Sequence, residues 1–307
     1  MAGLEATEPG EYPIGRMKVL LIANSAKPEA IAAGRKLLQT LRTKEGVSAQ
    51  YLEGVDQKCL DDLKDRPDLM VLLGGDGTIL QAARFLAQYQ VPVAGINFGK
   101  LGYMAAFTLE EFESHLPELL AGKLHITHRL MLEASIYRDR RPVGTDDDEK
   151  LQPETRCLAL NDVVLNAGTP FRMVELTVRV DNSDTATFRG DGIIISTASG
   201  STGYNLSAGG PLITPDVDAI VITPICAHSL SFRPVVVPDN CTIGLKPRRL
   251  NEGTHVVMDG VVVHPLSADH YVVVKKAPHR MELVVNPRQT HWELLARKLH
   301  WASRPTA

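Results

Sequence analysis

The fold of this chain is decided by residues 69–80, which read LMVLLGGDGTIL. The apolar run at 69–73 predicts a buried strand, and apolar residues at helical spacing from Thr78 to Gln88 predict a helix. A glycine-rich turn joins the two. Open α/β folds bind ligands where a strand ends and a helix begins, at the carboxyl edge of the sheet. The stretch therefore predicts an α/β domain with a ligand site at this turn.

The turn carries the residues of a phosphate site. The amino end of a helix offers unpaired N–H groups to an anion, and Gly74 and Gly75 let a phosphate approach the backbone closely. Thr78 can cap the helix or contact a phosphate through its hydroxyl. Asp76 would repel phosphates unless it had a task, such as holding Mg²⁺ through water or accepting the proton of an attacking hydroxyl. The alternative is an ordinary Asp-Gly turn between two strands, against which the helical pattern after Thr78 argues.

The flanking sequence repeats this strand-then-helix order. Strands are expected at 17–22, 47–51, 69–73 and 91–96, and helices at 28–44, before Pro67, at 78–88 and at 109–120. Strands that alternate with helices predict a mainly parallel sheet covered on both faces. Neither a P-loop nor the Rossmann glycine fingerprint is present, so a dinucleotide would have to bind by another route.

After His125 the pattern changes to short β-branched runs separated by polar turns. Strands are expected at 130–137, 157–165, 173–180, 192–196, 217–223, 235–237, 254–258, 271–275 and 281–285. This pattern predicts an all-β domain of two packed sheets, similar to a sandwich. The charged segment Arg138 to Arg156 is interpreted as a solvated loop.

The two patterns give the domain bounds. We expect a flexible extension at 1–16, an α/β domain at 17–124 and a β-rich domain at 125–288. A C-terminal helix at about 289–307 carries Trp292, Leu295 and Leu299 on one side. A helix this short is marginal alone, so we expect it to pack on the first domain.

The composition excludes several classes of protein. The 307 residues include 33 Lys and Arg against 36 Asp and Glu, a balance that argues against a nucleic-acid binder. No stretch approaches the roughly 18–20 apolar residues of a membrane span, and residues 1–15 lack the apolar centre of a secretory signal. The four cysteines form no C-x-x-C pair, which favours reduced thiols. We expect a cytoplasmic protein that binds neither nucleic acid nor membrane.

Three further polar segments fall in the β-rich region. Residues 189–192 read RGDG, and residues 197–211 read TASGSTGYNLSAGGP, with too many hydroxyls and glycines for a core. The second stretch can form a hydrogen-bonding loop in which Tyr204 stacks on a base, or a glycine-rich crossover with Tyr204 buried. Asn161 and Asp162, inside an apolar run, can face the vicinal hydroxyls of a sugar or mark a strand edge or bulge.

Five segments, taken in order, resemble the NAD kinase family. They are the turn at 74–78, the loop at 97–103, the pair Asn161-Asp162, the segment at 199–211 and the stretch TPICAHSLSFRP at 223–234. Lipid kinases and phosphofructokinases share a similar turn, but the five segments together are specific to the family.

The resemblance implies an activity. It implies transfer of a phosphoryl group from ATP, with polyphosphate as an open alternative, to the 2′-hydroxyl of the adenosine ribose of NAD, which makes NADP. It also implies a divalent cation, with Mg²⁺ favoured, and assembly as a homodimer or homotetramer. The Mg²⁺ would be held mainly by the donor phosphates, with Asp76 as a further ligand and no dedicated protein cage.

The resemblance also assigns residues. Asp76 is implied as the catalytic residue that deprotonates or orients the ribose hydroxyl. The residues implied to contact NAD are Asp76, Gly77, Asn161, Asp162, Arg172, Arg189, Asp191, Thr202, Gly203, Tyr204, Asn205, Leu206 and Ser207. Some of these contacts are expected to come from a neighbouring chain.

Four residues depart from the family pattern. Asp162 stands where Glu is usual, which keeps the charge and shortens the reach, and Gly203 replaces an alanine. Val261 stands where many relatives carry a polar Gln, and Ala227 replaces a proline.

Two other functions remain open. A lipid or sugar kinase would share the turn at 74–78 but would leave residues 199–211 unexplained. A non-catalytic NAD-binding regulator would keep the fold, and the presence of Asp76 argues against it.

Overall fold

The structure is a computed structural model that describes residues 17–55, 57–63, 65–99, 102–138, 152–181, 183–229 and 231–299. The expected extension at 1–16 lies outside the described residues, as does most of the charged segment Arg138 to Arg156. The chain divides into two compact units. One is formed by the residues up to His128 and those from Met281 onward, and the other by Arg129–Arg280.

The first unit is built on a six-stranded sheet, sheet A, with the order β2-β1-β3-β4-β18-β5. The pairs β2–β1, β1–β3, β3–β4 and β4–β18 are parallel. The strand bounds are β1 Met17–Ala23, β2 Val47–Glu53, β3 Leu69–Gly74, β4 Val93–Asn97, β5 Ile126–Arg129 and β18 Met281–Val284. The mainly parallel sheet expected from the sequence is confirmed.

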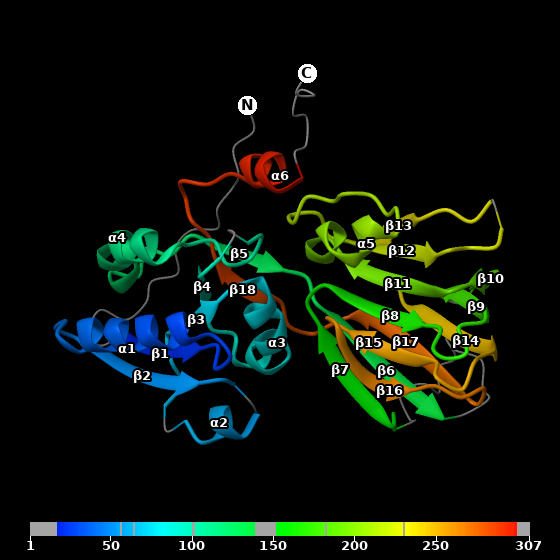
Figure 1. The fold of residues 1–307 in the computed structure, drawn as a ribbon, viewed down its shortest axis with the longest axis horizontal. Helices are drawn as coiled ribbons and strands as arrows, with labels where there is room; N and C mark the ends of the chain where they lie inside the picture. Colours follow the sequence, from blue (N-terminus) through cyan, green and yellow to red (C-terminus); the bar gives the residue numbers. More distant parts are fainter. Residues whose placement is uncertain are drawn as a thin grey trace. The chain divides into compact units, whose positions relative to one another are not determined.

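Helices cover both faces of sheet A (Figure 1). Their bounds are α1 Pro28–Arg42, α2 Gln57–Asp61, α3 Asp76–Leu86, η1 Ala87–Tyr89, α4 Leu109–Leu120 and α6 His291–Leu299. Buried residues of α1 and α4 share one core cluster with Ala94 and Ile96 of β4. Gly95, between them, points to the other face, where a Cβ on it would lie 2.6 Å from Ile79 Cδ1 of α3. The helix after the glycine-rich turn therefore packs on the face opposite α1 and α4.

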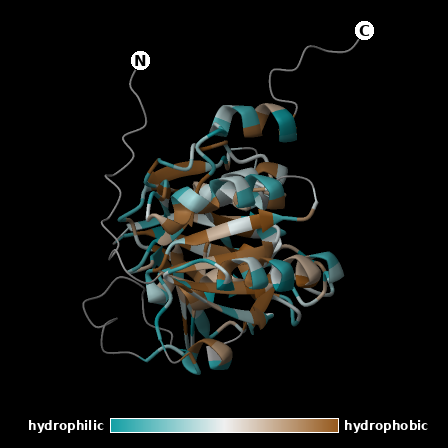
Figure 2. Ribbon diagram, turned by 90° about the vertical axis from the view of Figure 1, so that its left-hand side faces the viewer, coloured by the Kyte–Doolittle hydropathy of each residue, from teal (hydrophilic) through white to brown (hydrophobic). Residues whose placement is uncertain are grey.

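The second unit is a sandwich of two six-stranded sheets whose recorded strand pairs are all antiparallel. Sheet B has the order β10-β9-β14-β17-β6-β7, and sheet C has the order β13-β12-β11-β8-β15-β16. One cluster of buried side chains joins them, for example Leu132 and Ile136 of sheet B with Ile193 of sheet C. Apolar residues, in brown in Figure 2, concentrate on the strands. The two-sheet β region expected from the sequence is confirmed.

The bounds of the remaining elements follow. Those of sheet B are β6 Leu132–Arg138, β7 Thr155–Ala159, β9 Val174–Val180, β10 Ser183–Gly190, β14 Ile243–Arg249 and β17 His270–Lys276. Those of sheet C are β8 Asp162–Asn166, β11 Gly192–Thr197, β12 Ala219–Ile225, β13 Val235–Pro238, β15 His255–Met258 and β16 Val261–Pro265. The loop after β11 forms the 3-10 turn η3 Ser199–Thr202 and the short helix α5 Tyr204–Ser207.

The structure corrects three details of the expected pattern. The run 157–165 forms two strands rather than one, β7 in sheet B and β8 in sheet C, and the chain changes sheet at Leu160 and Asn161. The run 281–285, expected in the β-rich domain, supplies β18 of sheet A, because its register pairs Leu283 with Val93. Strands β10, β14 and β16 were not expected from the sequence.

The C-terminal helix buries other side chains than those expected. α6 buries Leu294 and Leu295, whereas Trp292 is 56% exposed. The apolar side of the helix is therefore narrower than the sequence spacing suggested.

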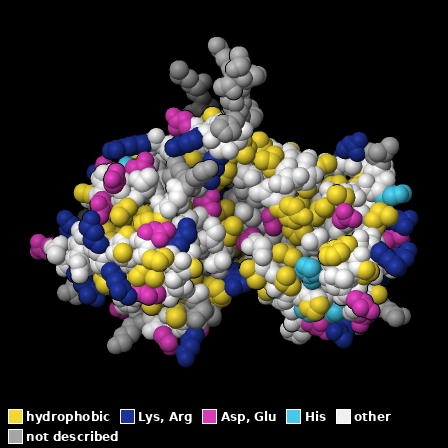
Figure 3. Space-filling view, in the orientation of Figure 1, with side chains coloured by type: hydrophobic (Ala, Val, Ile, Leu, Met, Phe, Trp, Pro, Cys, Tyr) yellow, Lys and Arg dark blue, Asp and Glu magenta, His cyan; other side chains and the backbone are white. Residues whose placement is uncertain are grey.

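The surface of the described part of the chain shows no single-sign field on the face in Figure 3, where basic and acidic side chains are interspersed. Within the described ranges, every helix is too short or too polar to span a bilayer.

Candidate active site

The glycine-rich turn begins where β3, buried along its whole length, reaches the edge of sheet A. Gly75 is the N-cap of α3 and has a φ of 150°, a conformation that side chains rarely adopt. A Cβ on Gly74 would lie 2.0 Å from Thr78 Oγ1. A side chain at position 74 would therefore collide with Thr78, and a side chain at position 75 would strain the backbone.

Two polar residues that the sequence did not single out hold this turn. Lys27 Nζ donates to Gly74 O at 2.9 Å, and Asn24 Nδ2 donates to Thr78 Oγ1 at 3.0 Å. Asn24 directly follows β1, the strand beside β3, so both strands end at the same edge of the sheet. The position of Asn24 at a strand end is the signal that could have identified it.

Asp76, the first residue of α3, is clamped by the backbone of a separate loop. Its Oδ2 accepts the N–H of Tyr103 at 2.7 Å, and its Oδ1 accepts those of Met104 and Ala105 at 3.0 and 2.9 Å. A Cβ on Gly102 would lie 1.8 Å from Asp76 Oδ1. The glycine at 102 is therefore what lets the loop close around the carboxylate.

A cation from the C-terminal helix approaches the same carboxylate. Lys298 Nζ of α6 lies 3.8 Å from Asp76 Oδ2 and 4.9 Å from the centre of the Tyr103 ring. The Asp76 and Lys298 side chains are 28% and 27% exposed, so solvent reaches both. Burial and the negative charge of Asp76 raise the pKa of Tyr103, whose hydroxyl is buried without a hydrogen-bond partner. Asp76 Oδ2 is thus the oxygen that remains open to a ligand.

The second unit contains a similar clamp around Asn161 and Asp162. Asp259 accepts the N–H groups of Leu160, Asn161 and Asp162 at 2.7 to 3.1 Å. Asp259 lies in the turn between β15 and β16 and has a φ of 48°. The sequence analysis missed this role, and the following Gly260, also at positive φ, was its only local signal.

Asp162 is buried beside this clamp, with 6% of its surface exposed. Burial, and to a lesser degree the negative charge of Asp259, raise the pKa of Asp162 to about 7. The carboxyl can therefore exchange a proton near neutral pH. Asn161 Oδ1 is buried and has no hydrogen-bond partner, which leaves an acceptor available to a ligand.

The hydroxyl-rich loop after β11 packs directly on this pair. Thr197 Oγ1 donates to Leu160 O at 2.7 Å and accepts the N–H of Gly200 at 3.0 Å. A Cβ on Gly200 would lie 2.2 Å from Asn161 O. Residues 197–203 and the pair Asn161-Asp162 therefore form one site in the second unit.

The loop exposes some of the expected NAD-binding residues and buries one. Gly203, Tyr204 and Ser207 are exposed, and Thr202 and Leu206 are half-buried. Asn205 is fully buried, where its amide donates to Ser201 O and Pro211 O and accepts from Thr223 Oγ1. The side chain of Asn205 thus holds the loop and has no exposed atom for direct contact with NAD.

Arg172, Arg189 and Asp191 lie away from Asn161 along the chain: Asp191 precedes β11, Arg189 is near the end of β10 in sheet B, and Arg172 follows the far end of β8. β11 begins at Gly192, opposite Asn166, and its Ser196 pairs with Asp162. A strand of this length spans about 20 Å, so Asp191 is remote from the site at Asn161 within one chain. The Arg189 Nε lies 3.4 Å from Glu175 Oε2. A hydrogen bond to Asp191 and the charge of that carboxylate raise the pKa of the Cys226 thiol.

Taken together, the first unit offers a strand-to-helix turn with an open carboxylate oxygen, and the second offers a loop of hydroxyls beside a buried acid. A turn of this kind can bind phosphate oxygens. A carboxylate fixed by N–H donors can accept a proton from a hydroxyl nucleophile. These are the parts that phosphoryl transfer to a sugar hydroxyl requires.

Comparison with known proteins points to the same family as the five sequence segments. Residues 56–124 match the ATP-NAD kinase N-terminal domain, and residues 160–286 match the ATP-NAD kinase C-terminal domain. An NAD kinase from Geotalea daltonii is 35% identical over 94% of this chain and 99% of its own length. An NAD kinase from Geobacter sulfurreducens is 33% identical over the same shares.

Solved structures share the fold. Yeast NADH kinase complexed with NADH superposes with a TM-score of 0.84 at 23% identity, over 96% of this chain and 91% of the yeast chain. An NAD kinase from Archaeoglobus fulgidus in complex with ATP superposes with a TM-score of 0.69 at 24% identity, over 89% and 95%. The resemblance inferred from the motifs is confirmed, and the chain belongs to the ATP-NAD kinase family.

Proposed function

We propose that this protein is an NAD kinase that transfers a phosphoryl group from ATP to the 2′-hydroxyl of the adenosine ribose of NAD. The observation that carries the proposal is Asp76, a partly exposed carboxylate held by three N–H groups at the end of β3. Its presence in this turn also favours catalysis over a regulator that only binds NAD.

Asp76 acts through its Oδ2 oxygen. Oδ1 accepts two N–H groups and Oδ2 accepts one, so Oδ2 keeps a lone pair for the ribose hydroxyl. The transition state of phosphoryl transfer is loose, so orientation of the hydroxyl contributes more than prior deprotonation. Lys298, 3.8 Å from Oδ2, offsets the negative charge that would otherwise repel the donor phosphates.

The donor phosphates are proposed to contact the turn itself. Gly75 and Gly77 leave the backbone accessible, whereas Gly74 is buried, and α3 directs its amino end at this point. The hydroxyl of Thr78 accepts from Asn24 and keeps its own proton for a phosphate oxygen.

A divalent cation, Mg²⁺ above all, is proposed to enter with the donor phosphates. The cation would be held mainly by the donor phosphates and by water, because the open lone pair of Asp76 Oδ2 is taken by the ribose hydroxyl. The cation would neutralise charge on the transferred group, while Asp76 holds the acceptor hydroxyl.

The adenosine ribose and the rest of NAD are proposed to contact the site at Asn161. Asn161 offers its unpaired Oδ1, and Asp162 accepts from a ribose hydroxyl when ionised. Thr202, Tyr204 and Ser207 contribute hydroxyls and a ring surface, and Gly203 and Leu206 contribute backbone and apolar contacts. Asn205 acts indirectly by holding the loop.

Arg172, Arg189 and Asp191 are proposed to contact NAD bound to a neighbouring chain of a homodimer or homotetramer. The separation of Asp191 from Asn161 by the length of β11 supports this assignment, and Arg189 lies two residues before Asp191 in the chain. The position of the protein in the cytoplasm is likewise a proposal, supported by its family.

The function is tested by measuring NADP⁺ formation from NAD⁺, ATP and Mg²⁺ with an NADP-specific dehydrogenase. We expect turnover that requires the cation, is lost in excess chelator and is not supported by diacylglycerol or fructose 6-phosphate in place of NAD⁺. Binding of NAD⁺ without turnover would instead indicate a regulator. Phosphorylation of the lipid or the sugar would indicate the other kinase classes.

A further inference from the structure

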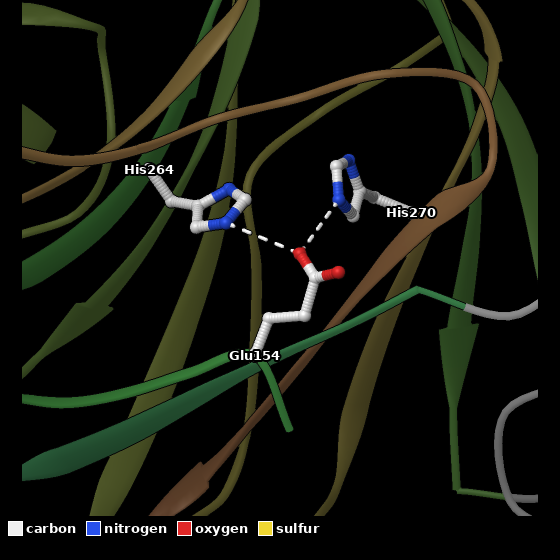
Figure 4. Close-up of side chains that lie close together, drawn as sticks. All are labelled: Glu154, His264 and His270. Carbon is white, nitrogen blue, oxygen red and sulfur yellow. Dashed lines mark hydrogen bonds and ion pairs between the residues drawn. The ribbon is translucent and has the colours of Figure 1, made fainter. Parts of the chain in front are cut away.

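Three side chains outside the candidate active site bring metal-ligand atoms together in the second unit. They are Glu154, His264 and His270, whose ligand atoms all lie within 4.8 Å of one another. Figure 4 shows the Glu154 carboxylate between the two imidazole rings. Glu154 Oε2 is 3.5 Å from His264 Nε2 and 3.1 Å from His270 Nε2.

These separations fit a shared transition-metal ion. A zinc ion with bonds of about 2.0–2.1 Å at tetrahedral angles places neighbouring ligand atoms about 3.3 Å apart. The two observed distances lie on either side of this value. Two imidazoles and one carboxylate are also a ligand set that suits zinc and similar ions better than Mg²⁺.

The ring contacts of His264 point to a cation in front of its Nε2. His264 Nδ1 lies 2.5 Å from Pro265 O, and a carbonyl can only accept, so Nδ1 carries the proton. In the neutral ring Nε2 then carries a lone pair, and this lone pair faces the Glu154 carboxylate. Two acceptors directed at each other repel, unless a proton or a metal ion lies between them.

The other two ligands are held by neighbouring groups. Arg138 Nε binds Glu154 Oε1 at 2.7 Å, which leaves Oε2 for the ion. His270 Nδ1 lies 2.8 Å from Ser267 Oγ, which donates to Asp269, and it accepts the N–H of Ser267 at 2.9 Å. In the metal-free form His270 Nε2 therefore donates to Glu154, and metal binding requires the ring proton to move to Nδ1, where Ser267 Oγ can accept it.

The position of the cluster indicates a structural role. Glu154 immediately precedes β7, the last strand of sheet B, and His264 lies on β16, the last strand of sheet C. His270 begins β17 of sheet B and is 3% exposed, whereas Glu154 is 34% exposed and leaves a side open to a water ligand. An ion here would connect the edges of the two sheets.

We propose that Glu154, His264 and His270 form a site for a divalent transition metal, of which zinc is the model, that joins the two sheets of the second unit. The ion is distinct from the Mg²⁺ that accompanies the donor phosphates.

The test uses the full chain after treatment with chelator. Zn²⁺ is titrated into wild type, His264→Asn, Glu154→Gln and the matched control His279→Asn, which changes an exposed histidine of the same unit. We expect one equivalent to bind per chain in wild type and in the control. Binding should be at least about 10-fold weaker in the other two variants, because even outer partners of metal ligands cost that much.

Two further measurements identify the type of ligand atom and show whether each variant is folded. Co²⁺ should give visible bands of a nitrogen and oxygen site without the near-ultraviolet charge transfer of thiolates, since none of the four cysteines takes part. Zn²⁺ should raise the melting temperature of wild type and control and leave that of His264→Asn unchanged. No binding to wild type, equal binding to His264→Asn, or a thiolate spectrum would each overturn the proposal. A melting temperature that responds to pH and not to zinc would mean that the cluster holds a proton instead.

Discussion

At the scale of single residues, Asp76 and Asp259 each hold a loop in place by accepting its backbone N–H groups. Each accepts the N–H groups of three consecutive residues, 103–105 and 160–162. An acceptor of this kind fixes a loop that has no regular hydrogen-bond ladder. Its removal leaves buried donors unsatisfied at about 1–3 kcal/mol each. Asp76→Ala should therefore lose stability as well as activity, and the two effects have to be measured separately.

The role of the Asp76 clamp can be tested without changing Asp76. A Cβ at position 102 would lie 1.8 Å from Asp76 Oδ1, so Gly102→Ala must displace the carboxylate or the loop. We expect the kcat for NADP⁺ formation to fall at least about 10-fold, since small misplacements of reacting groups are costly.

The matched control is Gly99→Ala in the same loop. A Cβ there would meet only Asn97 Oδ1, at an ordinary 3.8 Å. Its kcat should stay within a few fold of wild type. A Gly102→Ala enzyme as active as this control would mean that the clamp is not needed.

Asp162 should make stability depend on pH. Its folded pKa, about 7, lies above the ordinary value of 3.8, so the folded state binds the proton more tightly than the unfolded state. The free energy of unfolding should therefore fall as pH rises from about 4 to about 7 and change little beyond, by at most about 4 kcal/mol. Asp162→Asn removes this slope, which urea denaturation at several pH values would detect.

NAD⁺ affinity should show the opposite trend in wild type, rising as Asp162 ionises. A wild-type slope that persists in Asp162→Asn would exclude this residue as its source.

At the scale of elements, the sequence predicts contacts between neighbours in the chain and misses those between distant segments. The turn at 74–78 was recognisable because its strand, glycines and helix are consecutive. The roles of Asp259 and Lys298 could not be recognised in the sequence, because their partners lie about a hundred residues or more away in the chain. The same limit explains β18, whose apolar run is visible although its place in sheet A depends on β4.

Helix α6 contributes a cation to the candidate site. Lys298→Ala removes the ammonium near Asp76 Oδ2, so we expect kcat to fall about 10-fold or more, within the range for loss of one electrostatic contact. Lys298→Arg should restore part of the rate. Arg297→Ala, which removes the adjacent exposed cation of α6, is the control. Equal effects of Lys298→Ala and Arg297→Ala on kcat would show that only the general charge of the helix matters.

At the scale of the whole molecule, both units match domains of the ATP-NAD kinase family. The fold class of both units was predictable, since alternating and β-rich patterns are properties of long stretches. Which site residues lie close together could not be predicted from the sequence. Only the pairing of β8 with β11 reveals that Asn161 and Asp191 lie at opposite ends of this strand pair.

The proposed sharing of residues between chains predicts complementation. Asp76→Asn removes the catalytic carboxylate, and Arg189→Ala removes a contact proposed for the neighbouring chain's NAD. Mixed oligomers of the two variants should contain some sites with both residues intact. We expect their NADP⁺ formation to exceed that of either variant alone. Activity equal to the average of the two pure variants would place Arg189 in the site of its own chain.

The central claim, that Asp76 performs phosphoryl transfer to NAD, is tested most directly by single-turnover transfer of the γ-phosphoryl group of ATP to NAD⁺ in wild type and Asp76→Asn. Thermal melting and NAD⁺ binding are followed on the same samples, so that unfolding is not mistaken for lost chemistry. We expect Asp76→Asn to bind NAD⁺ within a few fold of wild type and to transfer the phosphoryl group at least about 10²-fold more slowly. A folded Asp76→Asn enzyme that transfers within a few fold of the wild-type rate would contradict the account.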